Sequence, residues 1–284
     1  MKKIIIVLLT LFFTTVSYAT SENPGNNSGS SSSPITIINS GKAGGSFNAR
    51  TQIYKDGLIA KGYDIKFENI GKLSQAVKMF KETDKPTIMI YSNNVVYKQD
   101  LFHTKENFII LEYQQPLFFC QTNASKNKID GLTVAHGKGY DTTMLTNVFA
   151  KLGKQVTLVP YKNSGAMLKG ILGGDVDMMF NNQGKSLKYI KSGEGYCWGN
   201  TGTSETIGVP SVYDAYNIDS KLPLMQATVI GTNIDVKVIR EVIVEISNED
   251  ALTEYHTSRS LYRPSGTWDE ELKLVQSMEG LWAN

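Results

Sequence analysis

Apolar residues recur along this chain with two periods, one typical of strands and one typical of helices. Both occur in the segment "VPYKNSGAMLKGILGGDVDMMF" (159–180). Four of its apolar residues repeat at helical spacing: Met167, Leu168, Ile171 and Leu172. Gly173 and Gly174 then supply the left-handed conformation that ends a helix, and the apolar strand "DVDMMF" follows. The segment is half of a β-α-β unit, and such units place ligand-binding loops at the carboxyl ends of their strands.

The same alternation continues over most of the chain. Strands are predicted at 35–41, 63–70, 87–92, 132–137, 155–161, 175–180 and 196–203. Helices are predicted at about 46–61, 72–82, 141–152 and 184–193 and within the quoted segment, and two more end the chain. The last of these begins with Thr267 and Glu270 in capping-box spacing. Residues 108–123 are rich in β-forming residues and are interrupted by Pro116, which must lie at an edge or a bend.

Two similar blocks of this alternation are separated near residues 116–123. Alternating strands and helices predict an α/β fold of mainly parallel sheets with helices on both faces. The two blocks predict two lobes with a cleft between them. We expect lobe 1 to comprise residues 35–118 and 200–284, and lobe 2 to comprise residues 119–199.

The first residues have a different pattern. Two lysines precede an apolar run from Ile4 to Phe13, which is too short to span a bilayer, and a small-residue cleavage signature ends at Ala19. Residues 1–19 are therefore predicted to be a cleaved signal peptide, with an uncleaved anchor as the alternative. Residues 20–34, rich in Gly, Ser and Asn, are expected to form a flexible linker. The protein is expected to be periplasmic.

Charge and cysteine content narrow the function. The formal net charge is +2, and removal of Lys2 and Lys3 with the signal peptide leaves zero. Because nucleic-acid-binding proteins usually carry a basic excess or stripe, no nucleic-acid partner is expected. Two cysteines are too few for a disulfide scaffold, although an oxidising compartment permits one bridge.

Catalytic and metal-binding patterns are not found. The three histidines, His103, His136 and His256, have no metal-ligand spacing, and we expect them at the surface or in loops. Neither a G-x-S-x-G elbow nor a P-loop occurs. Capping or solvent exposure explains Asp175 and Asp177. We therefore predict no enzyme activity, no catalytic residue, no metal and no cofactor.

Two loops are alike in the two blocks. Gly44-Gly45-Ser46 precedes the first helix, and residues 139–143 (Gly-Tyr-Asp-Thr-Thr) precede the corresponding helix of the second block. Free backbone N–H groups and the helix dipole attract anions to such positions. Ordinary capping by Ser46, Asp141 or Thr142 is the alternative for either loop alone. Two matching loops favour an anionic ligand held between them.

Five segments together resemble the TctC, or Bug, family of periplasmic solute-binding proteins. The quoted stretch is similar to the family signature "VPYKG…ALLGGQVD-MF". The other similar segments are "SGKAGGSFNA", "PTIMIYSNN", the pair "LFFCQTN" and "GYCWGNTG", and "IGVPSVYDA". Their order and spacing carry the resemblance, which covers residues 35–284.

The resemblance implies a two-lobed type II periplasmic-binding-protein fold with two crossing hinge strands. It also implies a cleft that often holds a carboxylate through backbone amides and water, and delivery of the ligand to the membrane subunits of a tripartite transporter. Matched to the loops of the family, the ligand-binding residues are Ala43, Gly44, Ser46, Phe47, Ser92, Asn93, Gly139, Tyr140, Asp141, Thr142, Asn181 and Asn182.

This sequence departs from the family pattern in two of these loops. The family commonly has Pro-Thr-Asp after the double glycine, where residues 46–48 read Ser-Phe-Asn. Small residues are usual after Gly139, where this chain has Tyr140 and Asp141. An acidic side chain in the cleft repels a dicarboxylate unless it caps its own helix or binds a ligand ammonium group.

We therefore expect a monomeric solute-binding protein that captures a small organic carboxylate for a tripartite secondary transporter. A sensory protein that presents its ligand to a membrane receptor would have the same cleft chemistry and is an alternative, as is a binder of an amino acid or another solute. Bidentate recognition of a carboxylate is not expected, because the predicted loops contain none of the four arginines: Arg50, Arg240, Arg259 and Arg263. Lys42 and Lys138 are the nearby cations.

The resemblance places "LFFCQTN" and "GYCWGNTG" in the two strands that cross between the lobes side by side. Neighbouring strands bring facing side chains within about 5 Å, which suits a disulfide between Cys120 and Cys197. Such a bond would fasten the hinge. Two buried free thiols are the alternative.

Overall fold

The computed structural model describes residues 33–92, 100–126, 128, 130–137, 142–216, 222–259 and 261–283. The predicted signal peptide and all but the last two residues of the predicted linker lie outside these ranges. Within them, no helix combines the length and the apolar character needed to cross a membrane.

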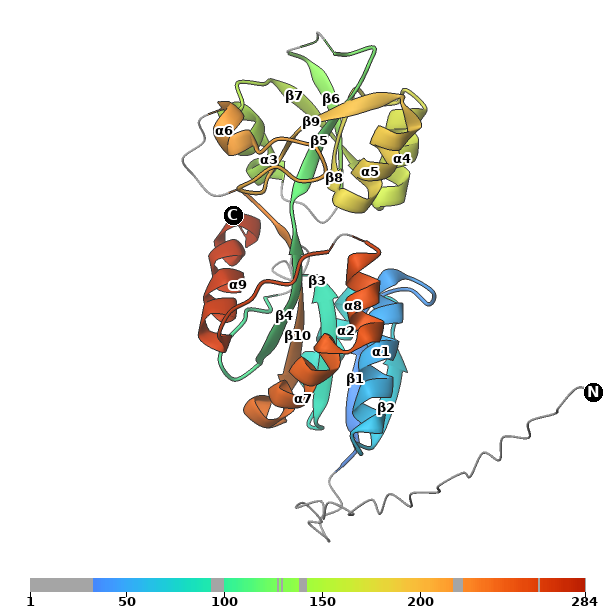
Figure 1. Cartoon of the computed structure of the whole chain (residues 1–284), viewed down its shortest axis with the longest axis vertical. Coiled ribbons are helices and arrows are strands. Elements are labelled where there is room, and N and C mark those ends of the chain that lie inside the picture. The colour runs from blue at the N-terminus through green and yellow to red at the C-terminus, as the bar shows by residue number, and fades with distance from the viewer. Residues whose placement is uncertain are drawn as a thin grey trace, which may run out of the picture. The chain divides into compact units, whose positions relative to one another are not determined.

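The first of two sheets has the strand order β2-β1-β3-β10-β4 (Figure 1). Its strands are β1 (Ile35–Asn39), β2 (Ile65–Asn69), β3 (Thr87–Ser92), β4 (Phe108–Gln115) and β10 (Met225–Thr232). β1 pairs in parallel with β2 and β3, whereas β10 runs antiparallel between β3 and β4. This sheet and its helices are called the first lobe.

Helices cover both faces of the first sheet because its strands are apolar on both sides. Ile37 packs with α1 (Ser46–Ala60), α7 (Val236–Asn248) and α8 (Asp250–Thr257). Its neighbour Ile38 points to the other face and packs with α2 (Leu73–Glu82). Successive strand residues point to opposite faces, so one fully buried strand supplies both cores.

The second sheet, in the second lobe, has the order β7-β6-β8-β5-β9. Its strands are β5 (Leu117–Thr122), β6 (Leu132–Gly137), β7 (Val156–Tyr161), β8 (Met178–Asn182) and β9 (Gly195–Asn200). Phe119 packs with α3 (Thr142–Lys151) and with Val212 of α6 (Val212–Tyr216). Phe118 packs on the opposite face with α4 (Ser164–Leu172) and α5 (Gln183–Ser192).

Two passages of chain join the lobes. Pro116 separates β4 from β5, and the second passage leads from β9 to β10. Thr201 ties the two passages together, because Leu117 N donates to its Oγ1 (3.0 Å) and its own N–H donates to Leu117 O (2.9 Å). The last helix, α9 (Trp268–Ala283), contributes Val275 to a cluster on β4 and Met278 to the core of the second lobe.

Most predicted elements are found, with two corrections. The sheets are mixed rather than mainly parallel, since each combines three parallel strands with two antiparallel pairings. Strand β10 and helices α6 and α8 were not predicted. The left-handed helix end is confirmed at Gly174 (φ 77°). The capping box is confirmed too, because Thr267 N donates to Glu270 Oε2 (2.8 Å) and Glu270 N donates to Thr267 Oγ1 (3.4 Å).

Cys120 and Cys197 form a disulfide. They face each other across the antiparallel pair of β5 and β9. Both strands belong to the second sheet, so the bond lies inside that lobe. The expectation that it fastens the hinge is therefore wrong. The passage between the lobes begins at Pro116, four residues before Cys120.

The histidines are expected at the surface or in loops, and His103 does lie in a loop, whereas His136 lies in β6 and His256 in α8, and all three are buried. His103, His136 and His256 are 2%, 1% and 7% exposed. The ring of His103 lies within hydrogen-bond distance of Thr228 Oγ1 (3.0 Å) and Glu279 Oε1 (2.8 Å). Nδ1 of His136 lies 2.9 Å from the backbone oxygen of Gly137. Burial is tolerated because each ring has polar partners. Among the described residues, no group of three His, Cys, Asp or Glu side chains could hold a metal ion.

Asp177 has a structural role that leads to a pH prediction. Partial burial raises its pKa, but hydrogen bonds from Thr133 N (2.9 Å) and Oγ1 (2.8 Å), together with Lys128, outweigh burial and lower the pKa below its usual range. The stability that it contributes should therefore be present above about pH 4 and be lost as the pH falls through its folded-state pKa.

We expect Asp177→Asn to lower the free energy of unfolding by about 1 kcal/mol at pH 7, because hydrogen bonds to a charged acceptor become neutral ones. The difference from the wild type should shrink below about pH 4. Urea unfolding between pH 7 and pH 3 measures it, with the exposed Asp175→Asn as the control. Equal pH profiles for the two variants would contradict this role.

Candidate functional site

The predicted first loop, residues 40–45, leaves the carboxyl end of β1. Asn39 is fully buried there, and its Oδ1 accepts a hydrogen bond from Gly41 N (3.0 Å). Gly44 has a φ of 73°, a conformation that a residue with a Cβ rarely adopts. Gly45 N donates to Lys42 O (2.9 Å), which closes the turn before α1. Gly44 is therefore required by the backbone conformation, whatever binds to the loop.

The start of α1 is open to an anion. Gly45 is the N-cap, the first turn holds no acidic residue, and no side chain of the described residues caps the helix. Capping by Ser46, the alternative raised from the sequence, is not observed. Ser46 is exposed and Phe47 is half-buried. An uncapped helix start leaves backbone N–H groups without partners, and the helix dipole adds partial positive charge.

The end of β3 lies beside this loop. Ser40 Oγ donates to Ile90 O (2.8 Å), which links the end of β1 to β3. Ser92, the last residue of β3, is 9% exposed, and its Oγ donates to Gln226 O (3.2 Å) in β10. The first lobe thus brings Ser92 and the first loop to one edge of its sheet. Asn93 lies outside the described residues.

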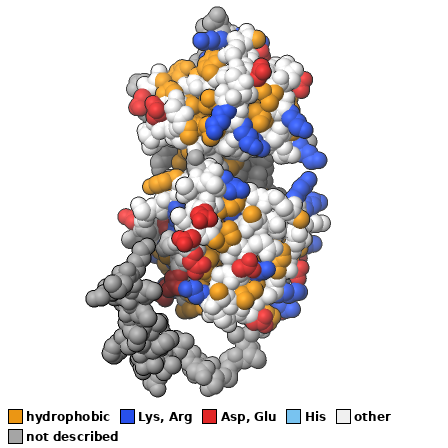
Figure 2. All heavy atoms as spheres, turned by 45° about the vertical axis from the view of Figure 1, so that its right-hand side comes forward, with side chains coloured by type: hydrophobic (Ala, Val, Ile, Leu, Met, Phe, Trp, Pro, Cys, Tyr) orange, Lys and Arg blue, Asp and Glu red, His pale blue; other side chains and the backbone are white. Residues whose placement is uncertain are grey.

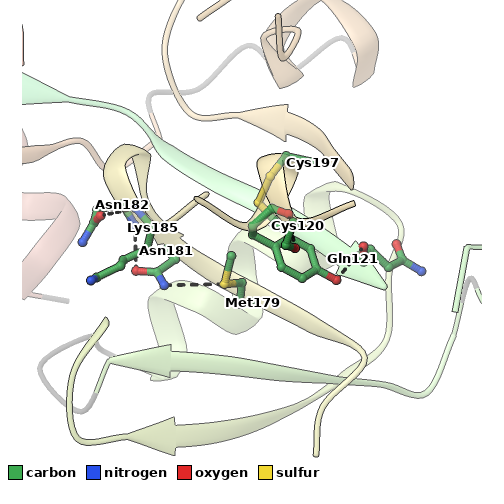
Figure 3. Close-up of a disulfide and its surroundings, with 9 residues drawn as sticks. Cys120, Gln121, Met179, Asn181, Asn182, Lys185 and Cys197 are labelled. Atoms are coloured by element: carbon green, nitrogen blue, oxygen red, sulfur yellow. Dashed lines mark hydrogen bonds between the residues drawn. A yellow bond between two sulfur atoms is a disulfide. The ribbon is translucent and has the colours of Figure 1, made fainter. Parts of the chain in front are cut away.

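Asn181 and Asn182 end β8 at the corresponding edge of the second sheet (Figure 3). Nδ2 of Asn181 donates to Ser164 O (3.1 Å), and its Oδ1 accepts from Asn182 N (2.9 Å). Oδ1 of Asn182 caps α5 through Lys185 N (3.1 Å), and its Nδ2 donates to Ser164 Oγ (2.9 Å). Both amide groups hold the starts of α4 and α5 in place.

The remaining predicted residues follow β6. Gly139, Tyr140 and Asp141 lie outside the described residues, and Thr142 is the exposed first residue of α3. Because β6 and β8 are parallel neighbours, the segment after β6 starts at the same sheet edge as Asn181. Each lobe therefore has a pair of loops at the carboxyl ends of two adjacent parallel strands, where open α/β sheets bind ligands.

Arg50 is a residue beside the site that the sequence reasoning missed. It is fully buried, four residues after Ser46, so helical spacing could have indicated the contact. Nε of Arg50 donates to Ser46 O (3.4 Å), and its guanidinium carbon lies 4.3 Å from the ring centroid of Phe47. Burial alone would lower its pKa, but the Glu112 carboxylate and neighbouring tyrosines raise it, so Arg50 stays cationic.

Charge is divided unequally between the lobes. Residues 119–216, which include α6, contain ten lysines and seven acidic residues, a net charge of +3, and the other residues after Ala19 carry −3. In Figure 2 the upper, second lobe carries several lysines beside a few acidic side chains, and the lower, first lobe carries a group of acidic side chains together with Lys and Arg along its right-hand edge. A field of this kind attracts small anions towards the second lobe over a distance of about one Debye length.

A surface hollow of about 680 Å³ lies away from these loops, in the first lobe. It is lined by the starts of α7 and α9 and by Lys105 and Glu106. Lys105 pairs with Asp269 (2.9 Å), and Asp235 caps α7 through Lys237 N (3.0 Å) and Val238 N (3.1 Å). These charged groups that line the hollow are engaged in an ion pair and a helix cap, so we do not place the site there.

No family model matches the sequence, and no curated protein sequence is significantly similar to it. Solved structures are similar in fold. A TctC solute-binding protein from Polaromonas has a TM-score of 0.66 at 14% sequence identity, over 88% of this chain and 96% of that chain.

Two further structures hold a ligand. R. palustris Rpa4515 with adipate has a TM-score of 0.65 at 15% identity, over 88% of this chain and 94% of that chain. MatC (Rpa3494) from Rhodopseudomonas palustris with bound malate has a TM-score of 0.63 at 14% identity, over 88% of this chain and 97% of that chain. The likeness confirms the predicted two-lobed periplasmic-binding-protein fold.

Proposed function

We propose that this protein is an extracytoplasmic solute-binding protein that captures a small organic carboxylate and delivers it to the membrane subunits of a tripartite secondary transporter. The observation that carries the proposal is the uncapped start of α1, without an acidic residue in its first turn, at the carboxyl end of β1. A carboxylate there would accept hydrogen bonds from the backbone N–H groups of residues 46–48.

Two observations support an anionic ligand. The positive charge of the second lobe raises the local concentration of anions. Structures of the same fold hold adipate and malate, and both are dicarboxylates.

Asp141 is the reason to keep a second ligand class. An acid at the start of α3 either caps that helix or binds the ammonium group of an amino acid. We expect a thermal-shift screen of residues 20–284 to separate the two classes, because a bound ligand raises the melting temperature by mass action. A shift with malate, adipate or related carboxylates supports the proposal. A shift with amino acids alone favours the ammonium role, and no shift in either set contradicts carboxylate capture.

Transport and sensing use the same binding chemistry, so they require a separate test. We expect deletion of the gene in its host to abolish uptake of the radiolabelled carboxylate found in the screen. Unchanged uptake with loss of a transcriptional response to that carboxylate would favour the sensory alternative. The mature N-terminus, expected at Thr20, can be read by mass spectrometry of the exported protein.

Gly45→Val tests the anion position directly. A Cβ at Gly45 would lie 3.0 Å from Lys42 O, so the turn must shift, and the branched side chain would cover the start of α1. Each lost hydrogen bond to a charged ligand is worth about 1.5–3 kcal/mol, so we expect the dissociation constant for malate or adipate to rise at least about tenfold.

Isothermal titration calorimetry measures this constant. The matched control is Gly266→Val, since Gly266 precedes α9 outside the predicted site, and a Cβ there meets only Glu270, at 3.4 Å or more. Both variants should have far-ultraviolet circular dichroism spectra like the wild type. Equal affinity in a folded Gly45→Val protein would remove the start of α1 from the site.

A further inference from the structure

The first turn of α1 is held from below by buried side chains. The carbonyl of Ser46 accepts hydrogen bonds from Arg50 Nε (3.4 Å) and from Tyr255 OH (3.3 Å) in α8. The carbonyl of Phe47 accepts one from Thr51 Oγ1 (2.7 Å). In a trans peptide the C=O of one residue and the N–H of the next lie in one plane and point in opposite directions. Contacts to the carbonyls of Ser46 and Phe47 therefore fix the direction of the N–H groups of Phe47 and Asn48.

Arg50 is itself held by groups from other elements. Its Nη1 pairs with Oε2 of Glu112 in β4, and its guanidinium lies 4.9 Å from the ring centroid of Tyr113. The other carboxylate oxygen, Oε1 of Glu112, lies 3.4 Å from Nε2 of His256 in α8. Arg50, Glu112 and His256 are 0%, 0% and 7% exposed. The group thus links α1, β4 and α8 beneath the first loop.

Stability alone does not account for this arrangement. An apolar pair of similar volume often replaces a buried ion pair without loss of stability. The buried region around the ion pair also contains unsatisfied polar atoms. Nη2 of Arg50 and the hydroxyl of nearby Tyr54 have no hydrogen-bond partner among the described residues. What an apolar pair could not supply is the donor to Ser46 O and the planar cation against the ring of Phe47.

We infer that Arg50 is a positioning residue for ligand binding, which fixes Ser46 and Phe47 so that the start of α1 is preorganised for a carboxylate. Glu112 holds the guanidinium in place and neutralises its charge. The inference rests on the proposed function. It assigns Arg50 a role one layer below the ligand, whereas the predicted loops themselves contain no arginine.

A double variant separates this role from stability. Arg50→Met with Glu112→Leu removes both charges and keeps the volume. Its control is Arg240→Met with Glu271→Leu, a second largely buried pair of the first lobe whose Nη1 and Oε2 atoms are 3.1 Å apart, on α7 and α9. We expect the Arg50 double variant to weaken malate or adipate binding at least tenfold, mainly through faster dissociation, and the control to stay within about twofold.

Arg50→Lys is the second variant, in case the double variant fails to fold. Lysine keeps the charge and can pair with Glu112, but it lacks the planar fork. We expect it to restore the melting temperature more fully than the affinity. Wild-type affinity in a folded Arg50 variant would overturn the inference, because a positioning role requires the affinity to fall.

A measurement without ligand keeps the two proposals distinguishable. Hydrogen exchange followed by mass spectrometry reports on the first turn of α1, where Ala49 N donates to Gly45 O (3.0 Å). We expect exchange over residues 46–52 to be at least tenfold faster in the Arg50 double variant and unchanged in the Arg240 control. If exchange accelerates but the wild type binds neither malate nor adipate, the proposed function fails, whereas the role of Arg50 in ordering the first turn of α1 stands. Unchanged exchange contradicts the positioning role.

Discussion

Replacing Cys120 and Cys197 by alanine is expected to lower the free energy of unfolding by about 4 kcal/mol. The bond joins residues separated by 77 positions, and the chain-entropy model gives about this value for the loop that it closes in the unfolded state. For a chain of this size, the melting temperature should fall by about 8–16 °C. Urea unfolding of the variant, and of the wild type with a reductant, measures the loss.

The position of the bond gives this prediction a second part. Because both cysteines lie in the second sheet, removal of the bond should leave ligand affinity unchanged at temperatures where the variant is folded. If the bond crossed the hinge, its removal would instead change the ligand affinity as well as the stability. Alkylation of the denatured wild type without reductant, followed by mass spectrometry, should modify neither thiol. Two modified thiols would exclude the bond.

Phe119→Ala is expected to cost about 3–5 kcal/mol, the usual loss for a large aromatic residue in a core. The Phe119 ring is fully buried among those of Phe149, Phe180 and Trp198, with centroids 5.5, 4.8 and 4.9 Å away. Three rings surround the vacated space from two strands and one helix, so the cavity cannot close by the movement of one side chain.

Urea unfolding followed by circular dichroism measures this loss. Val238→Ala is the control, since Val238 is 55% exposed on α7 and its truncation should change the free energy of unfolding by less than about 0.5 kcal/mol. A loss below about 1 kcal/mol for Phe119→Ala would mean that the surrounding side chains collapse into the space, contrary to the packing described.

The parts of the fold that the sequence predicts are those with local signals. The two β-α-β blocks are read from periodicity, because each strand and helix buries one face against its neighbours in sequence. Strand β10 lacks such a signal. Its sequence "MQATVIGT" mixes small, polar and apolar residues, yet Gln226 and Thr228 are fully buried because β10 lies between β3 and β4. Both flanking strands come from more than 100 residues earlier, so the neighbouring sequence does not indicate this burial. Missing this strand concealed the antiparallel pairings of the first sheet.

The residues of the candidate site also divide into those that a local sequence signal indicates and those without such a signal. Glycine patterns indicate the first loop, and the end of β8 follows from the strand before it. The side chains beneath the loop were missed because their partners are remote: Arg50 pairs with Glu112 at a separation of 62 positions. The burial of His103 in its loop was missed for the same reason, since its partner Glu279 is 176 positions away. A single sequence contains no signal for such pairs, because each charged residue considered alone is predicted to be exposed.

The central place of β10 imposes an order of assembly on the chain. The five strands of the second sheet are contiguous in sequence, from Leu117 to Asn200, so that sheet can form as soon as those residues are available. The first sheet cannot, because β10 lies between β3 and β4, and without it both strands present unpaired edges. Contacts between distant segments also form late, since loop closure costs entropy before it is rewarded. The lobe that begins first along the chain is therefore the last to complete, and until residues 225–232 arrive its edges are open to pairing with other chains.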